Sequence, residues 1–250
     1  MNSTCPPIPE NIPDSFEDEE TDSVMSQHAF DQFLFVGLPY VCLVVFFLMT
    51  IYRYRTQSFS YSSLSSQFLE NKQHFWSVVP FHYGVLTITA GHLIALFIPR
   101  SILIWNRQPL RMFVLEIAAL AFGFLTMIGL IEVIVRRLGN AKVRCVTVVS
   151  DWILFGMLLA QVVLGVGIAL FHPWGAGWFS ACLSPYLWSI FLLDPNVSYV
   201  SAMPWLVKLH IILAFLIVGY FPFTRLVHVL VIPNPYLWRK TQVVRWYSKR

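Results

Sequence analysis

The sequence contains few charged residues and no closely spaced cysteines. Of its 250 residues, 12% are Asp, Glu, Lys or Arg, and 57% are hydrophobic. Soluble domains have about 25% charged residues, so this composition excludes an ordinary soluble core and is typical of a membrane protein. The four cysteines form neither a CxxC pair nor a CxxCH motif. This spacing argues against a covalent c-type haem, an iron–sulfur cluster or a zinc site held by this chain alone.

The first 28 residues have no apolar periodicity. They hold seven acidic residues and four prolines, so we expect a disordered acidic tail. They do not look like a cleavable signal peptide, because no basic start is followed by an apolar stretch. We therefore divide the chain into the acidic tail 1–28, a membrane domain 29–238 and a basic tail 239–250.

Five apolar segments follow the tail, and each is long enough to cross a bilayer as a helix. The sequence therefore predicts an all-α integral membrane protein with five transmembrane helices. A further apolar stretch, Leu183–Leu193, is too short to span and is interpreted as an interfacial or re-entrant segment. The five predicted helices are Phe30–Tyr52, Phe75–Ile98, Met112–Val135, Val149–Phe171 and Trp205–Ile232.

Basic residues are distributed unequally between the two ends of these helices. Three follow the first segment, four follow the third and six lie at the end of the chain, all on one side of the membrane. The other side has three in the second loop and none in Phe171–Pro204. The positive-inside rule then places the N-terminus outside and the C-terminus in the cytoplasm.

Two of the predicted helices carry two histidines each. His210 and His228 are eighteen residues apart, which on one continuous helix is five full turns and roughly 27 Å, so both would share one face. His82 and His92 are ten residues apart, roughly 15 Å. Because the second and fifth helices run in opposite directions, we expect His82 to pair with His228 near the inner surface and His92 with His210 near the outer surface.

Each histidine pair can hold the iron of one b-type haem through two imidazole nitrogens. We expect Gly84 and Gly91 to leave flat space for a porphyrin, and the unequal spacings predict tilted haems or a second helix bent near Pro80. A proton relay would call for carboxylates beside the histidines, and the second and fifth segments have none. A haem-free membrane adaptor or proton-conducting subunit is therefore the less favoured alternative.

Four basic residues at the membrane surfaces are further candidates. Arg111 and Lys208 lie at the predicted outer surface, where each could contact a quinol headgroup or an outer haem propionate, or simply reach the lipid interface. Arg137 and Arg225 lie at the predicted inner surface. They could hold inner haem propionates, and a lipid or partner-subunit contact would look the same in sequence.

Three stretches carry a family resemblance: FHYGVLTITAGH, IVRRLGNAKVR and KLHIILAFLIVGYFPFTRLVHVLVIPNPYLWRK. Together they resemble the gamma, cytochrome b subunit of respiratory nitrate reductase, over about residues 30–245. The resemblance implies five membrane helices, two b haems and quinol oxidation near the outer haem. It assigns His92 and His210 to the outer haem and His82 and His228 to the inner one, and places Arg111 where the family has a basic residue implicated in quinol binding.

The resemblance also implies partners. Electrons would pass to an iron–sulfur beta subunit and a molybdopterin alpha subunit on the cytoplasmic face of a bacterial or archaeal cytoplasmic membrane, and this chain would hold no nitrate site. Lipid and the quinone pool are the other expected partners, and no nucleic acid is expected. A nitrite oxidoreductase with reversed electron flow, or another quinone-linked respiratory complex such as a heterodisulfide-reductase-like one, remains an alternative.

Overall fold

The computed structural model describes residues 29–57, residue 60 and residues 74–230. Within these residues the secondary structure is helical, with no strand. The predicted acidic tail 1–28 and basic tail 239–250 lie outside the described residues.

The predicted five-helix, all-α membrane architecture is confirmed. Five helices are long and apolar enough to span a membrane. The first covers Ala29–Thr56, in which a π-helical turn, η1, precedes the regular helix α2. The membrane helices are η1 (Phe33–Gly37) with α2 (Leu38–Thr56), α3 (His74–Phe97), α5 (Pro109–Gly139), α7 (Val149–Phe171) and α11 (Trp205–Tyr220).

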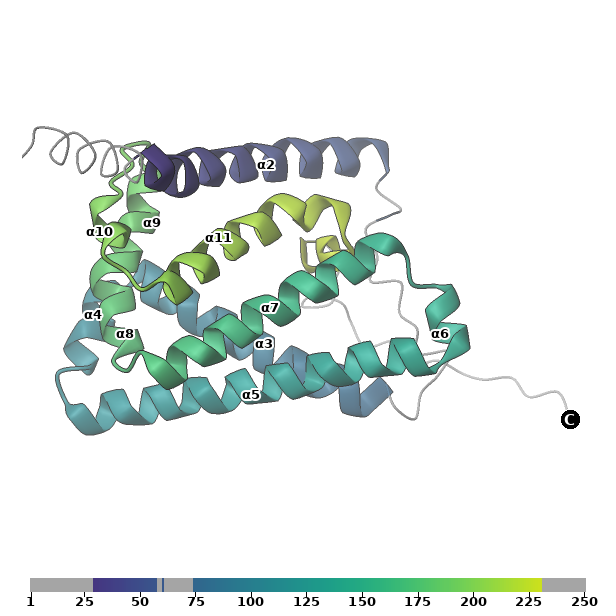
Figure 1. Ribbon diagram of the computed structural model, residues 1–250, viewed down its shortest axis with the longest axis horizontal. Coiled ribbons are helices and arrows are strands. Elements are labelled where there is room, and N and C mark those ends of the chain that lie inside the picture. The colour runs from purple at the N-terminus through teal and green to yellow at the C-terminus, as the bar shows by residue number, and fades with distance from the viewer. Residues whose placement is uncertain (1–28, 58–59, 61–73, 231–250) are drawn as a thin grey trace, which may run out of the picture.

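The membrane helices pack in a sequence of neighbours rather than around a single central helix. α3 packs mainly on α5, α5 on α7, α7 on α11, and α11 on α2 (Figure 1). The two helices that were expected to lie side by side, α3 and α11, therefore each have other principal partners.

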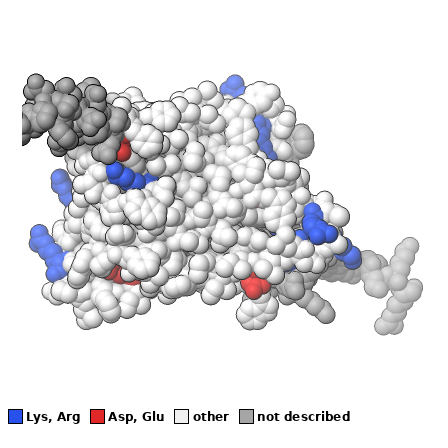
Figure 2. Space-filling model, in the orientation of Figure 1, with Lys and Arg blue, Asp and Glu red and all other residues white. Residues whose placement is uncertain are grey.

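Charged side chains lie toward the two ends of the helices. Figure 2 shows a broad uncharged band across the middle of the face in view, with Lys, Arg, Asp and Glu near either end of it. Large exposed apolar side chains are found along all five helices, among them Phe47, Leu86 and Ile128. This distribution suits a helix bundle whose middle is surrounded by lipid.

The predicted interfacial segment belongs to a run of short helices at one end of the bundle (Figure 1). We call residues 175–201 the cap, and we call the end of the bundle beneath it the cap end. α4 (Pro99–Trp105) lies at the same end, and α6 (Ala141–Cys145) marks the opposite, α6 end (Figure 1). The cap consists of α8 (Gly175–Trp178), η3 (Phe179–Leu183), α9 (Ser184–Phe191) and α10 (Ser198–Ser201).

The cap is attached to the end of α3 by two side-chain hydrogen bonds. Ser184 Oγ donates to the Ala95 carbonyl and Trp188 Nε1 to the Leu96 carbonyl, each at 2.9 Å. A helix leaves its last carbonyls without backbone partners, and here Pro99 has no N–H to offer to Ala95. The cap supplies the donors that the end of the helix lacks.

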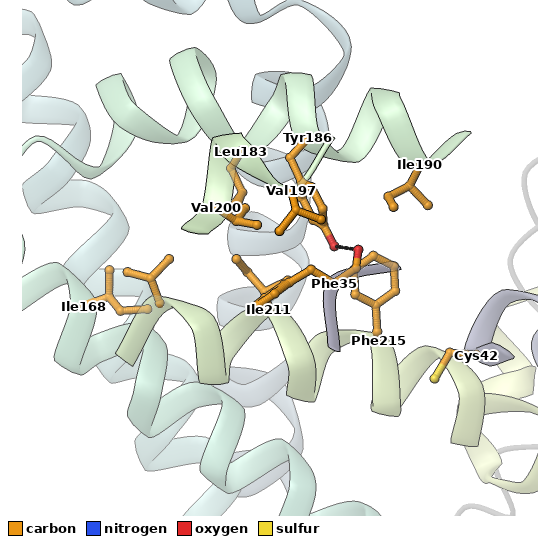
Figure 3. Close-up of a cluster of buried hydrophobic side chains, with 11 residues drawn as sticks. Phe35, Cys42, Ile168, Leu183, Tyr186, Ile190, Val197, Val200, Ile211 and Phe215 are labelled. Carbon is orange, nitrogen blue, oxygen red and sulfur yellow. Dashed lines mark hydrogen bonds between the residues drawn. The ribbon is translucent and has the colours of Figure 1, made fainter. Parts of the chain in front are cut away.

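A buried apolar cluster joins the cap to the first and fifth membrane helices (Figure 3). At its centre Tyr186 donates its hydroxyl to the Phe35 carbonyl at 2.7 Å, and the two rings meet edge to face with centroids 6.3 Å apart. Burial, with a smaller contribution from Tyr40, raises the pKa of Tyr186. Eleven buried residues form the cluster: Phe35, Cys42, Ile168, Leu183, Tyr186, Ile190, Val197, Val200, Val207, Ile211 and Phe215.

The fifth helix is shorter than predicted. The prediction of one helix to Ile232 is wrong, because α11 ends at Tyr220 and is followed by two 3₁₀ segments, η4 (Phe221–Phe223) and η5 (Arg225–Leu230). Between them Thr224 is extended, with ψ 177°. Pro222 cannot donate a backbone hydrogen bond, and Arg53 of α2 donates to the carbonyls of Pro222 and Thr224. The chain therefore leaves the line of α11 after Tyr220 (Figure 1).

Candidate functional site

The four candidate histidines lie on three elements. His82 and His92 are on α3, His210 is on α11, and His228 is on η5 beyond the break in the fifth helix. The expectation that His210 and His228 share one face of a continuous helix, roughly 27 Å apart, is therefore wrong. The eighteen-residue rise was calculated for one helix from His210 to His228, but that helix ends at Tyr220. The difference between the His82–His92 and His210–His228 rises therefore cannot be used to predict tilted haems.

Three of these histidines make the same hydrogen bond. Nδ1 lies 2.8 Å from the Val78 carbonyl in His82, and 2.8 Å from the Ile88 carbonyl in His92. In His228, Nδ1 contacts the Arg225 carbonyl. A carbonyl oxygen can only accept, so Nδ1 carries the proton and Nε2 keeps its lone pair. This is the tautomer that an imidazole needs to bind a metal through Nε2.

His210 has different surroundings. Its Nε2 lies 3.2 Å from Gln161 Nε2 of α7, and its buried Nδ1 has no hydrogen-bond partner among the described residues. The ring lies against Gly165, where an added Cβ would stand 3.1 Å from His210 Cε1. An electrostatic interaction links His210 with His92, the two residues predicted to share the outer haem.

The surroundings of the histidines fit a haem in several respects. Helices in direct contact are 8–10 Å apart, and α3 and α11 are not among the main packed pairs, so a flat macrocycle between them need not displace a helix interface. Gly91, beside His92, faces open space. Phe179 of the cap meets the His92 ring edge to face at 5.2 Å. A bound haem supplies four nitrogen ligands itself, so two imidazoles complete the iron coordination.

The expectation that Gly84 leaves space for a porphyrin is wrong. A Cβ at Gly84 would stand 2.7 Å from Thr126 N and would also collide with Thr126 Oγ1. Gly129 allows a similar approach, since a Cβ there would stand 2.8 Å from Phe81 Cα. These glycines bring α3 and α5 close together, which is the role small residues commonly have between membrane helices.

The two arginines predicted at the inner surface belong to one network at the α6 end. Arg225 forms a 2.7 Å ion pair with Asp151 and donates to the Val146 carbonyl at 2.7 Å. Arg137 donates to Thr147 Oγ1 at 2.9 Å, and its guanidinium lies 5.0 Å from the centre of the Phe155 ring. Since the Arg225 carbonyl also contacts His228, the network extends to the histidine itself.

The two basic residues predicted at the outer surface are both at the cap end, but they are not together. Lys208 forms a 3.4 Å ion pair with Asp31 and lies 5.8 Å from the centre of the Phe35 ring. Arg111 is exposed in the first turn of α5 and stacks over Trp105 at 5.1 Å. A cavity of about 520 Å³ lies nearby and is lined by Pro109, Leu110, Phe113, Glu116, Pro173 and Trp174.

Three residues with direct roles in this arrangement were not predicted: Gln161, Arg53 and Asp151. Gln161 is a polar residue within an apolar membrane segment, a pattern that favours a position inside the bundle, so the sequence did contain a signal for it. Asp151 was also visible as an acid in the first turn of α7, but its pairing with Arg225 depends on the fold.

Comparison with known proteins shows the family of the chain. The family model described as nitrate reductase gamma subunit matches residues 31–247. The nitrate reductase gamma chain of Bacillus subtilis is 30% identical over 223 residues, covering 86% of this chain and 97% of the Bacillus chain. The respiratory nitrate reductase 2 gamma chain of Escherichia coli is 32% identical over 222 residues, covering 83% and 93%.

The chain belongs to the nitrate reductase gamma subunit family. The family resemblance found in the sequence is thereby confirmed, and the five apolar helices make this gamma-family chain a multi-pass integral membrane protein. A more distant similarity also exists. A component of the dihydromethanophenazine:CoB–CoM heterodisulfide reductase of Methanosarcina barkeri is 28% identical over 120 residues, covering 48% of this chain and 39% of that one.

Proposed function

We propose that this gamma-family chain is a membrane cytochrome b subunit that oxidises quinol near the cap end and delivers the electrons to nitrate reductase subunits at the α6 end. The observation that carries the proposal is the set of four histidines. Three of them have Nδ1 bonded to a backbone carbonyl and Nε2 available, and the fourth, His210, interacts electrostatically with His92.

His92 and His210 would hold one haem at the cap end, and His82 and His228 a second at the α6 end. Bound haem supplies one-electron transfer, and two such groups give electrons a path across the membrane. The chain's own residues fix the ligands. Backbone carbonyls set the tautomer of His82, His92 and His228, and the Asp151–Arg225 pair holds the segment that carries His228.

At the cap end, Arg111 is the candidate for contacting the quinol. It lies exposed in the first turn of α5, where a cation can meet a polar headgroup at the membrane surface. Lys208 is a weaker candidate, because Asp31 and the Phe35 ring already surround its ammonium group.

At the α6 end, the basic surface is the expected docking site for partners. Lys142 and Arg144 of α6 are exposed there, beside the Arg137–Arg225 network. Gamma chains are by name subunits of nitrate reductase, and we propose that an iron–sulfur subunit and a molybdopterin subunit bind at this face in the cytoplasm.

The test is spectroscopy of the complex purified in mild detergent, combined with a quinol:nitrate assay. Wild-type protein should show a b-type α band in the reduced-minus-oxidised spectrum and about two haems per chain. His92→Ala should lose about half of the haem and nearly all quinol oxidation. His172→Ala is the matched control, since His172 lies at the end of α7 outside the four-histidine set, and it should keep both haems. Absence of any b-type band in the wild type would exclude the proposal.

A second candidate keeps the same architecture with other partners. The similarity to a heterodisulfide reductase component supports it over 48% of the chain. In that case the purified complex would carry the same haem signals and oxidise a quinol-like donor without reducing nitrate, and the proteins that copurify would distinguish the two.

A further inference from the structure

His210 differs from the other three histidines in lacking a backbone carbonyl as partner. Its Nε2 lies 3.2 Å from Nε2 of Gln161, which reaches it from α7, 49 residues earlier in the chain. This difference calls for an explanation, because a histidine that binds a metal needs its second nitrogen protonated and bonded to an acceptor.

The acceptor for such a bond is present, because turning over the Gln161 amide brings Oε1 to the place of its Nε2, 3.2 Å from His210 Nε2. Gln161 Oε1 and His210 Nδ1 are buried, and neither has a hydrogen-bond partner among the described residues. A buried polar atom without a partner costs about 1–3 kcal/mol, so each of these two atoms is unfavourable unless another group or a ligand serves it. The oxygen and nitrogen of a glutamine amide differ little in shape, and their orientation follows from hydrogen bonding.

We propose that Gln161 is the positioning residue for His210. Its amide oxygen accepts the Nε2–H of the imidazole and leaves Nδ1, the ring nitrogen without a partner among the described residues, for the iron. Gln161 thus fixes the tautomer of His210 at Nε2, as the backbone carbonyls of Val78, Ile88 and Arg225 fix that of the other three histidines at Nδ1.

Gly165 makes this arrangement possible. It lies one turn after Gln161 on α7, and the absence of a side chain there lets the His210 ring approach the helix. α7 thus contributes to the cap-end haem site although it carries no haem ligand, and Gln161 makes that haem sensitive to the charge on α7.

This inference rests on the proposed function, and it is tested by the redox potential and the electron paramagnetic resonance signal of the cap-end haem. Gln161→Glu keeps an acceptor and adds negative charge, which strengthens the hydrogen bond from the imidazole N–H and favours ferric iron, so the midpoint potential should fall. Gln161→Leu removes the acceptor, so the potential should rise and the resonance of this haem should broaden. The α6-end haem should remain unchanged in both variants.

Val163→Leu is the matched control, because Val163 lies on the exposed side of α7. It should give wild-type potentials for both haems. If Gln161→Leu loses the haem altogether, Gln161→Glu still decides the matter through its potential. Wild-type potentials and resonances in both Gln161 variants would overturn the inference while leaving the proposed function intact, whereas a wild-type protein without b-type haem would overturn the proposed function itself.

Discussion

Single hydrogen bonds determine which nitrogen of each histidine is available. In an apolar membrane interior no water competes for the imidazole N–H, so the partner must come from the protein. For His82 and His92 the partner is the carbonyl four residues earlier on the same helix, which any helix could provide. For His210 the partner comes from a second helix, α7. Mutating the α7 residues that contact His210 therefore tests this arrangement.

Gly165→Ala should disturb the cap-end haem site. The added Cβ would stand 3.1 Å from His210 Cε1, which is tighter than ordinary packing, so the ring must shift at a cost of about 1–3 kcal/mol. We expect a changed resonance of the cap-end haem and reduced quinol oxidation. Gly167→Ala is the control, since a Cβ there would stand 3.4 Å from the flexible end of Leu206. Equal behaviour of the two variants would contradict the packing of His210 against α7.

Tyr186→Phe should destabilise the cap. It removes the 2.7 Å hydrogen bond and leaves the Phe35 carbonyl unpaired, which costs about 1–3 kcal/mol. Because burial raises the pKa of Tyr186, the folded protein keeps a proton that the unfolded chain releases above about pH 10. The stabilisation from Tyr186 is therefore complete below pH 10 and falls above it, so wild type and variant should converge there.

The measurement for Tyr186→Phe is the denaturation midpoint in detergent at several pH values. Tyr199→Phe provides a control at a cap tyrosine that is 39% exposed, and it should change little. If the denaturation midpoints of Tyr186→Phe and wild type moved further apart above pH 10, the expected loss of Tyr186 stabilisation at high pH would be contradicted.

At the scale of elements, the break in the fifth helix is held from outside that helix. Arg53 on α2 donates to the carbonyls of Pro222 and Thr224, and also to Ser60. The break directs the chain into η5 and so places His228, while the Asp151–Arg225 pair ties η5 to the start of α7. Two cations from different parts of the chain thus position one histidine.

Arg53→Lys should weaken this arrangement. A lysine ammonium lacks the planar fork with which arginine reaches both carbonyls and Ser60, so we expect a loss of about 1–3 kcal/mol and a shifted spectrum of the α6-end haem. Arg55→Lys, two residues later at an exposed position on the same helix, should match wild type. The two variants are compared by thermal denaturation and by haem spectra. An unchanged α6-end haem in Arg53→Lys would show that the break does not depend on this residue.

The membrane helices were predictable and the break was not, for physical reasons. Length and hydropathy alone define a span, and the predicted second segment, Phe75–Ile98, nearly coincides with α3, His74–Phe97. The break after Tyr220 involves Arg53, which bonds to Pro222 from 169 residues earlier in the chain, and no local pattern shows that contact. The same holds for Gln161 and Gly84, whose polarity and size are visible in the sequence but whose neighbours are not.

For the whole molecule, the proposed function depends on how the protein is oriented in the membrane. Quinol oxidation at the cap end and electron delivery at the α6 end require the cap outside and α6 in the cytoplasm. The distribution of basic residues predicts this orientation, since the exposed Lys142 and Arg144 lie at the α6 end.

Cys145 allows that orientation to be measured. It is exposed at the end of α6. In a chain whose other cysteines are replaced by serine, a membrane-impermeant thiol reagent should label Cys145 in inverted vesicles and leave it unlabelled in intact spheroplasts. Leu192→Cys in a chain without other cysteines is the matched control, because Leu192 is 71% exposed at the cap end and should label in the opposite pattern. Labelling of Cys145 from outside would place α6 on the outer face, and the basic surface there would then lie on the side of the membrane away from any cytoplasmic electron acceptor.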